Sequence, residues 1–368
     1  MQPQEPIRLV GGTGSPYTQK MVALLRYRRV PYAVTWGDPG RVCDALGVEQ
    51  PKPIFMPTFF FEEDGATRAV CDSTPIIRRL ENIYPDRSVL PEDAALAFID
   101  YLIEDFADEW CTKYMFHYRW YAEADADNAG TLLPLGMDVS LPKDAHAQFK
   151  RWVAERQIGR LYVVGSNDTT APVIDASYRR LLAALEDHLA NQKFMLGKRP
   201  GSGDFGLYGQ LSQLVGFDPT PRQIAHQVSP RTVAWVDQLC DQSGLEPGEQ
   251  DWVNLEEQPQ SLAGLLREIG RVYAPAQLAN ARAVQAGEKT WETEIDGAAW
   301  TQQTFPYQAK CLQWTNERYR ALGDADRAIV DTLLEGTGIE TMLSLNPPTE
   351  EKYDDSASHK EPRDRDDG

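Results

Sequence analysis

The sequence has no apolar run of the roughly 18 residues that a membrane-spanning helix needs. Its first ten residues, MQPQEPIRLV, contain neither the basic stretch nor the long apolar stretch of a secretory signal. We therefore expect no membrane partner. The default expectation for such a chain is a cytoplasmic protein.

Disulfide and metal chemistry also lack their usual residues. There are five cysteines, an odd number, and none belongs to a C-x-x-C pair. This pattern excludes a disulfide framework and a zinc site of the usual spacing, so we expect reduced, mostly buried thiols. The five histidines are scattered singly, which leaves metal catalysis without a ligand set. We expect no metal cofactor.

Positive charge is scarce. The chain has 37 Lys and Arg against 55 Asp and Glu, a formal net charge of −18. Nucleic acid is therefore a poor partner, because a polyanion needs a basic stripe on the protein. The first 90 residues are nearly neutral, with 11 basic and 10 acidic side chains. A small anionic ligand remains possible there.

A length of 368 residues suggests two domains, at roughly 150 residues each. In the first part, apolar runs and turn residues alternate in the order strand, helix, strand, helix, strand, strand, helix. The expected strands are 7–10, 32–36, 55–61 and 67–71, and the expected helices begin at residue 16 and span 42–46 and 74–84. Because the last two strands are joined by a short turn, we expect an antiparallel hairpin.

The pattern becomes mainly helical after residue 91. Apolar residues recur at spacings of three and four over 99–114, which predicts one buried helix face. Further helices are expected at 145–153, 176–191, 205–215, 231–239, 261–286, 306–322 and 324–334. We expect a loop at 123–143, a hairpin at 291–305 and a disordered tail at 349–368, which has 8 acidic and 4 basic residues.

The glycine-rich segment 11–14 lies where a dinucleotide-binding loop would lie, and Asp38 is at the distance of a ribose-binding acid. However, Tyr17 stands where the third glycine should pack, and Pro16 already begins the helix. The nucleotide interpretation is therefore disfavoured. Ser15 then has two interpretations: a structural helix N-cap, or a hydroxyl that holds an anion such as a thiolate together with the free N–H groups of the helix.

Two further segments have an ordinary and a functional interpretation. Met56-Pro57 is an X-Pro step leading into a strand, which is a tolerated position for proline. Asp72-Ser73-Thr74-Pro75 is an acid followed by a hydroxyl-rich helix start, and helix capping alone accounts for it. Neither segment identifies a function by itself.

Together these segments resemble a known family in both order and spacing. The glutathione-binding, thioredoxin-like domain of the cytosolic glutathione S-transferases is similar to the chain at these motifs: Ile7-Arg8-Leu9-Val10, Ser15-Pro16-Tyr17, Lys20, Met56-Pro57-Thr58, Asp72-Ser73-Thr74-Pro75-Ile76, Tyr84-Pro85 and Leu90-Pro91. The segments 194–197 and 201–209 resemble the family's helical domain at its buried capping box. Two departures are Asp72, where the family usually has Glu, and Gly201, where Ser or Thr is typical.

The resemblance implies a thioredoxin-like α/β domain at 5–88 and an all-helical domain at 92–240. It fades at about Leu239, so residues 241–345 are expected to be a mostly helical extension, followed by an acidic tail at 346–368. The tryptophans of the extension are expected to be packing residues, with a role in shaping the site as the alternative; they are Trp252, Trp291, Trp300 and Trp314.

The resemblance also implies a function, namely transfer of glutathione, as co-substrate, to a hydrophobic electrophile. In a serine-type member Ser15 would be the catalytic residue. The implied glutathione-binding residues are Tyr17, Met56, Pro57, Asp72 and Ser73. The implied substrate pocket consists of Trp110, Tyr114, His117 and Tyr118, for which core packing is the alternative. The family also implies a homodimer.

Two other functions remain open at the level of the sequence. One is a non-catalytic binding or scaffold protein that kept the fold, which the departures and the extension favour. The other is a glutathione-dependent lyase or isomerase, which uses the same thiolate.

Overall fold

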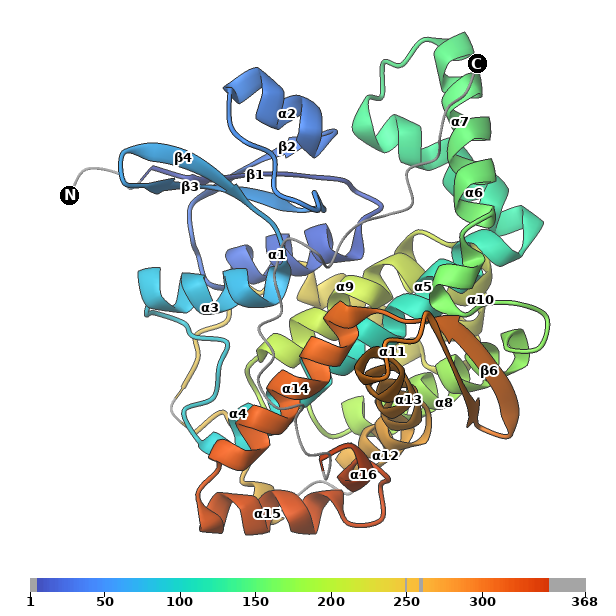
Figure 1. Ribbon diagram of the computed structural model, residues 1–368. Coiled ribbons are helices and arrows are strands. Elements are labelled where there is room, and N and C mark those ends of the chain that lie inside the picture. The colour runs from blue at the N-terminus through green and yellow to red at the C-terminus, as the bar shows by residue number, and fades with distance from the viewer. Residues whose placement is uncertain (1–4, 249, 258–260, 344–368) are drawn as a thin grey trace.

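The computed structural model describes residues 5–248, 250–257 and 261–343. The expected tail at 346–368 lies outside these residues. Figure 1 shows a small sheet with helices on both sides, followed in the chain by a large helical part. The N-terminal elements are β1 (Ile7–Gly11), α1 (Pro16–Tyr27), β2 (Tyr32–Trp36), α2 (Pro39–Leu46), β3 (Thr58–Glu63), β4 (Ala66–Val70) and α3 (Ser73–Ile83).

The N-terminal sheet has the strand order β2-β1-β3-β4. β1 pairs with β2 in parallel and with β3 antiparallel, and β3 and β4 form the expected antiparallel hairpin. Helices α1 and α3 cover one face of the sheet and α2 covers the other (Figure 1). Alternate strand residues therefore face two separate cores: Leu9 and Phe59 pack with α1 and α3, whereas Val10 and Phe60 pack with Cys43 of α2. This confirms the predicted thioredoxin-like arrangement.

The third strand begins later than expected. It starts at Thr58, whereas the sequence predicted residue 55. Pro53 and Pro57 lack a backbone N–H to donate to a sheet, so the segment before Thr58 does not join the ladder. Phe55 is 57% exposed in consequence.

The helical part begins with α4 (Ala94–Phe106), the π-helical turn η1 (Ala107–Cys111) and α5 (Thr112–Tyr121). These three segments form the long buried helix that the spacing at 99–114 predicted. It is followed by α6 (Glu123–Met137), α7 (Lys143–Ile158), η2 (Leu161–Val164), α8 (Ala171–Leu189), α9 (Ser202–Gly216), α10 (Pro219–Val228) and α11 (Pro230–Leu239). None of the helices that the structure describes is long and apolar enough to cross a membrane.

The loop expected at 123–143 is wrong, because most of it is helix α6. Small residues allow α6 to approach α7 closely: a Cβ atom on Gly130 would lie 3.3 Å from the carbonyl oxygen of Lys150. The fully buried Asp125 fixes the start of α6, since its carboxylate accepts hydrogen bonds from the backbone and hydroxyl of Thr220. Tertiary packing thus outweighs the weak helix propensity of the Gly, Asp and Pro residues.

The atypical Gly201 at the start of α9 has a packing reason. A Cβ atom at this position would lie 2.2 Å from Oδ1 of Asp100, on α4. The Asp100 carboxylate accepts hydrogen bonds from the backbone N–H groups of Ser202 (3.1 Å) and Gly203 (2.9 Å). A neighbouring helix therefore supplies the cap that a side chain at position 201 would otherwise provide.

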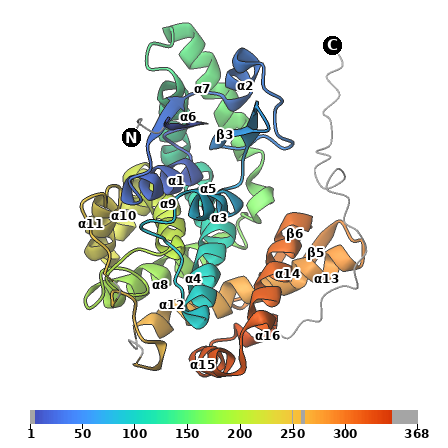
Figure 2. The same cartoon turned by 90° about the vertical axis from the view of Figure 1, so that its left-hand side faces the viewer.

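The last part of the chain packs against the buried helices of the second part. Its elements are η3 (Leu255–Glu257), α12 (Leu262–Glu268), η4 (Ile269–Tyr273), α13 (Ala274–Gln285), β5 (Thr290–Ile295), β6 (Ala298–Gln303), α14 (Pro306–Ala321), α15 (Asp324–Leu334) and α16 (Glu340–Leu343). β5 and β6 form the expected hairpin. Figure 2 shows α13, α14, α16 and the β5–β6 hairpin on one side of α4 and α5, and α14 contacts α4.

Candidate functional site

Ser15 lies between the end of β1 and the first turn of α1. Its Oγ accepts a hydrogen bond from the backbone N–H of Thr18 at 3.2 Å, so the residue is an N-cap. The hydroxyl also donates to the carbonyl oxygen of Met56 at 3.5 Å, the long limit for a hydrogen bond. The side chain is only partly buried. Its proton is therefore weakly engaged and is available to a ligand at the helix N-terminus.

The loop that carries Ser15 is held by the helical domain. Arg119 of α5 donates through Nη1 to the carbonyl oxygen of Gly14 at 2.7 Å. Arg119 is itself paired with the fully buried Asp218 (Nη2 to Oδ2, 2.9 Å). Gln213 of α9 donates to the carbonyl oxygen of Thr13 at 3.3 Å. These contacts fix the backbone in front of α1.

The Met56–Pro57 peptide bond is cis, and Pro57 is buried before β3. The Met56 carbonyl faces the Ser15 hydroxyl. The Met56 sulfur lies beside Gly12, since a Cβ atom added to Gly12 would be 3.1 Å from it. Met56 and Ser15 are therefore brought together.

Tyr17 points away from these groups towards the helical domain. Its hydroxyl donates to the backbone carbonyl of Asp108, in η1, at 2.8 Å. Burial raises the pKa of Tyr17 well above its usual value, and the Asp108 carboxylate adds to the effect. The hydroxyl is thus a neutral donor that joins α1 to η1.

Asp72 and Ser73 stand at the start of α3. Asp72 has a φ angle of 85°, a region that residues other than glycine rarely adopt. Its Oδ2 accepts a hydrogen bond of 2.6 Å from the hydroxyl of Tyr307, on α14. Burial raises the pKa of the Asp72 carboxyl, although the hydrogen bond from Tyr307 and the charge of Lys20 oppose the shift.

A buried charge cluster lies directly behind Ser73. The fully buried Lys20 of α1 donates to Ser73 Oγ at 3.0 Å and pairs with Glu104 at 2.9 Å and Asp108 at 2.5 Å. Arg78 of α3 also pairs with Glu104, at 3.0 Å. The cluster joins α1, α3 and α4 behind the start of α3.

The electrostatics of this cluster follow from burial and pairing. Burial disfavours the Lys20 ammonium, but the Asp108 and Glu104 carboxylates outweigh this effect and raise the pKa of Lys20. Burial raises the pKa of Asp108 to about 6, against the opposing charge of Lys20. Asp108 Oδ1 has no hydrogen-bond partner among the described residues.

The four residues predicted to line a substrate pocket lie in the core instead. Their exposed fractions are 0% for Trp110 and Tyr114, 5% for His117 and 6% for Tyr118. Each side chain has an internal hydrogen-bond partner: Trp110 Nε1 donates to Tyr114 Oη, His117 Nδ1 bonds Ser166, and Tyr118 Oη donates to Asp175. Burial lowers the pKa of His117 to about 4, so this histidine is neutral at pH 7.

These aromatic residues pack against the C-terminal extension. The ring centroids of Trp110 and Trp300 are 5.5 Å apart, and Trp300 is fully buried. Lys113 donates to Gln302 of β6 at 3.0 Å, and burial lowers the pKa of this lysine to about 8. Core packing is therefore the interpretation that these contacts favour for the cluster.

Apolar side chains do border the Ser15 loop, but they are other residues. A Cβ atom on Gly14 would meet Leu133 of α6 at 2.2 Å and Phe217 at 3.8 Å. Both side chains are only partly buried. They flank the loop on the side of α6 and α9.

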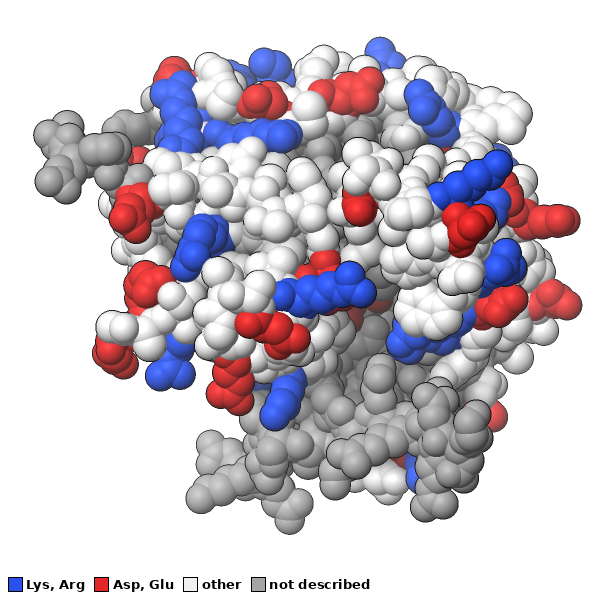
Figure 3. Space-filling view, turned by 90° about the horizontal axis from the view of Figure 1, so that it is seen from above, with Lys and Arg blue, Asp and Glu red and all other residues white. Residues whose placement is uncertain are grey.

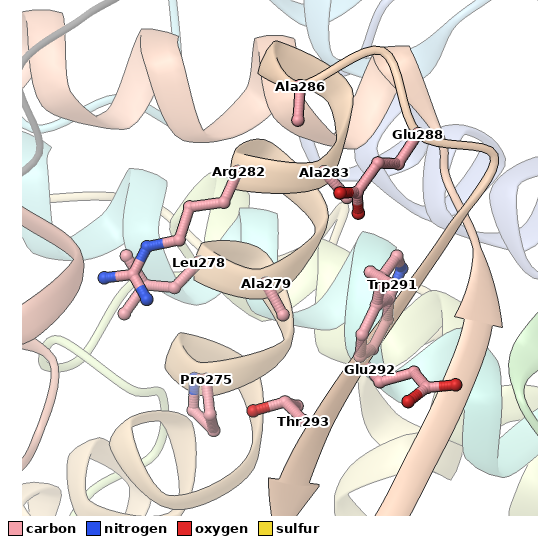
Figure 4. Close-up of a pocket in the computed structure, with 10 residues that line it drawn as sticks. All are labelled: Pro275, Leu278, Ala279, Arg282, Ala283, Ala286, Glu288, Trp291, Glu292 and Thr293. Atoms are coloured by element: carbon pink, nitrogen blue, oxygen red, sulfur yellow. The ribbon is translucent and has the colours of Figure 1, made fainter.

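Two hollows occur elsewhere, both in the extension. One, of about 440 Å³, lies between α13 and β5, where the labelled Trp291 faces the helix (Figure 4). The other, of about 600 Å³, lies beside α15 and α16. Neither is lined by any of the predicted site residues.

We also looked for a charged surface patch on the face in Figure 3 and for metal ligands among the described residues. Basic and acidic side chains are interspersed on the face that Figure 3 shows. Within the described parts of the chain, no group of three or more His, Cys, Asp and Glu side chains is placed to hold a metal ion. All five cysteines are free.

Sequence reasoning missed three kinds of residue at this site. Glu104 and Asp108 interrupt an otherwise apolar helix face, and charged residues on such a face signal a buried ion pair. Arg119 is likewise a charged residue among aromatic ones, and it is buried in an ion pair with Asp218. Tyr307 gave no signal, since it lies 235 residues from Asp72 in the chain.

The family comparison matches the N-terminal domain. Residues 9–88 match the family model described as glutathione S-transferase, N-terminal domain. A search of curated proteins finds no match.

Several solved structures are similar to the chain. A glutathione S-transferase of Ceriporiopsis subvermispora in complex with glutathione is 20% identical, with 64% of this chain and 98% of that chain covered and a TM-score of 0.42. A glutathione transferase family member from Pseudomonas fluorescens with two glutathione bound is 16% identical, covering 72% and 94%, with a TM-score of 0.38. A glutathione S-transferase-like protein from Pseudomonas syringae is 12% identical, covering 70% and 82%, with a TM-score of 0.42.

The match to the family model spans the domain that holds Ser15, Met56 and Asp72, and the strand order of this domain is the thioredoxin-like one. Residues 9–88, which hold this site, are therefore similar to the N-terminal domain of the glutathione S-transferases.

Proposed function

We propose that the protein binds glutathione and transfers its thiolate to an electrophilic carbon of a hydrophobic substrate. The observation that carries this proposal is the Ser15 hydroxyl, which stands at the N-terminus of α1 with its proton weakly engaged by Met56. A helix N-terminus and a hydroxyl donor together favour an anion. In the reaction the thiol proton leaves to solvent and the sulfur forms a bond to carbon. In a substitution the leaving group departs with the electron pair of its bond to that carbon; in an addition the electron pair of the broken π bond stays on the substrate and takes up a proton from solvent.

The energetic requirement is modest. A free thiol titrates near 8.5. A hydrogen bond to a charged group contributes roughly 1.5 to 3 kcal/mol, which corresponds to about one to two pKa units. One donor from Ser15 therefore lowers the thiol pKa to roughly 6.5–7.5, which ionises about a quarter to three quarters of the sulfur at pH 7.

The other ligand contacts follow from the placement of the site residues. We assign the Met56 backbone, shaped by Pro57, to the cysteinyl part of glutathione. We assign Asp72 and Ser73 to the γ-glutamyl end. Tyr17 supports the site by joining α1 to η1 through its bond to Asp108.

The electrophile would approach from the apolar side of the Ser15 loop. The predicted pocket residues are buried, whereas Leu133 and Phe217 border this loop and remain partly accessible. We therefore place the hydrophobic substrate beside these two side chains.

The test is the Ser15→Ala variant. If the hydroxyl stabilises a thiolate, the substitution should raise the thiol pKa of bound glutathione and slow conjugation by roughly one to two orders of magnitude, at about 1.4 kcal/mol per decade. Glutathione affinity should change far less. The thiolate absorbance of the complex, followed against pH, and conjugation rates with an electrophile panel measure both effects.

Ser229→Ala is a matched control, because Ser229 caps α11 by the same contact: its Oγ accepts from the N–H of Thr232 at 3.2 Å. Loss of this cap should reduce stability without moving the titration of the bound thiol. Coincident titration curves for wild type and Ser15→Ala would reject the catalytic assignment and leave Ser15 an N-cap.

A non-catalytic binding protein is the second candidate, and the contact of the extension with Asp72 favours it. This candidate predicts glutathione binding without turnover of any electrophile in the panel. A glutathione-dependent lyase or isomerase would instead return free glutathione.

The homodimer also stays a prediction. Sedimentation at micromolar concentration tests it against the mass of one chain, 41.4 kDa.

A further inference from the structure

We infer that Tyr307 of the C-terminal extension is a positioning residue for the γ-glutamyl end of the glutathione site, and that it sets selectivity for a thiol that carries this group. The inference rests on the proposed function. It adds to it a residue outside the N-terminal domain, from a part of the chain with no resemblance to the family.

The first turn of α14 contacts Asp72 of the site and Glu109 of η1. Tyr307 Oη donates to Asp72 Oδ2 at 2.6 Å, and Gln308 Nε2 donates to Glu109 Oε2 at 3.1 Å. The ring of Trp314 meets that of Tyr307 edge-on, with centroids 6.2 Å apart. Tyr307 is therefore held in place from its own helix while it contacts Asp72.

Asp72 is a residue whose orientation needs support. It precedes α3 with a φ angle of 85° and makes no side-chain capping bond to that helix. A non-glycine residue in this region persists only where its surroundings fix it. The Tyr307 hydrogen bond is a charge-assisted contact that holds one carboxylate oxygen.

The same contact leaves room for a ligand. An ionised carboxylate has about four acceptor sites, and Tyr307 fills one of them. The remaining sites can accept the ammonium group of a γ-glutamyl residue. Ser73 is held alongside by Lys20, so the two residues assigned to this end are positioned by two different parts of the chain.

A purely structural role for Tyr307 predicts a different result. If the hydroxyl only anchors α14, its removal lowers the stability of the chain and affects all thiol ligands equally. If it positions Asp72, its removal weakens only those ligands that have the γ-glutamyl ammonium. Selectivity between two ligands therefore separates the two roles.

The experiment titrates the full-length chain calorimetrically with glutathione and with cysteinylglycine, which lacks the γ-glutamyl group. Tyr307→Phe keeps the ring and removes the hydroxyl. We expect glutathione affinity to fall roughly tenfold, the loss of one hydrogen bond to a charged group, and cysteinylglycine affinity to stay unchanged. An equal change for both ligands, or none for glutathione, would overturn the inference.

Tyr319→Phe is the matched control on the same helix. Its hydroxyl donates to Asp331 at 2.5 Å, in a pair that is exposed and does not include a site residue. This variant should bind both ligands as the wild type does. A loss of selectivity here would show that any weakening of α14 produces the effect, and would overturn the inference.

A second variant tests the route through Asp72 without changing α14. Asp72→Asn should lose the same selectivity, and adding Tyr307→Phe to it should cause no further loss. Additive losses would show that Tyr307 acts elsewhere. A wild-type chain that does not bind glutathione would reject the proposed function itself, whereas binding that is indifferent to Tyr307 rejects this inference alone.

Discussion

The thiol end and the γ-glutamyl end of the proposed site are built in different ways. At the thiol end, Ser15 and Met56 are 41 residues apart and contact each other within one domain. At the γ-glutamyl end, Asp72 contacts Tyr307, 235 residues away, and Ser73 contacts a lysine that is paired to α4 and η1. The two residues of the first end lie in one domain, and the helical domain only holds the backbone of their loop. The second end is built from side chains of three parts of the chain.

This difference affects how each end responds to substitution. The Ser15 hydroxyl is partly exposed, and removing it leaves no buried charge behind. Lys20, Glu104 and Asp108 are buried together, so removing Lys20 takes the ammonium from Asp108 and leaves Glu104 with Arg78. Substitutions in the buried cluster behind the γ-glutamyl end should therefore affect folding, and substitution of Ser15 at the thiol end should affect chemistry.

The largest effect is expected for Lys20→Met. This variant leaves Glu104 and Asp108 without the ammonium that compensates them, and breaking a buried ion pair in this way costs about 3–5 kcal/mol. Urea unfolding of the full chain measures the loss. Glutathione binding should also weaken, because Ser73 loses its partner.

Arg8→Met is the control for charge removal in the same domain. Arg8 pairs with Glu62 at 3.5 Å, and their side chains are 47% and 65% exposed. An exposed pair of this kind contributes about 0–1 kcal/mol. Equal losses of unfolding free energy for Lys20→Met and Arg8→Met would show that the buried cluster stabilises the fold no more than the exposed pair does.

Sequence reasoning predicted the locally determined features. The strand, the glycine turn and Pro16 at the start of a helix lie in one short segment, so neighbouring residues suffice to predict Ser15 at the helix start. The hairpin at Asp296-Gly297 was predicted for the same reason: both residues adopt the positive φ angles that such a turn requires.

The features that sequence reasoning missed depend on tertiary contacts. Helix α6 was taken for a loop because its Gly, Asp and Pro residues are poor helix formers, and only its packing against α7 and Thr220 explains it. The spacing of the aromatic residues after Phe106 fits both the wall of a pocket and a packed core, so spacing alone does not distinguish the two. The extension that buries them, with Trp300 at its centre, decides between the two.

A smaller effect is expected from the contact between α4 and the extension. Burial raises the pKa of Asp105 to about 7, although its carboxylate accepts a 2.6 Å hydrogen bond from Tyr273. The folded state therefore binds a proton between about pH 4 and 7 that the unfolded state has released, so stability falls as pH rises through this window. Asp105→Asn removes this contribution.

Between pH 5 and 8, the wild type should lose roughly 1–3 kcal/mol more than Asp105→Asn, on the scale of about 1.4 kcal/mol per pKa unit. Urea unfolding at several pH values measures the slopes. Asp331→Asn is the control, because Asp331 also accepts a tyrosine hydroxyl but is exposed. Parallel slopes for wild type and Asp105→Asn would contradict the assignment.

The smallest effect is expected within the N-terminal domain itself. Asp38 caps α2, since its Oδ1 accepts from the N–H of Arg41 at 2.8 Å, and both side chains are exposed. Asp38→Ala removes the cap and should cost about 1 kcal/mol, whereas Asp38→Asn keeps an oxygen acceptor and should cost far less. Neither variant should change glutathione affinity, because the cap is local and α2 carries no residue of either end of the site. A change in affinity with the cap intact would show that the thiol end also depends on side chains of α2, and the two ends would then no longer differ in how they are built.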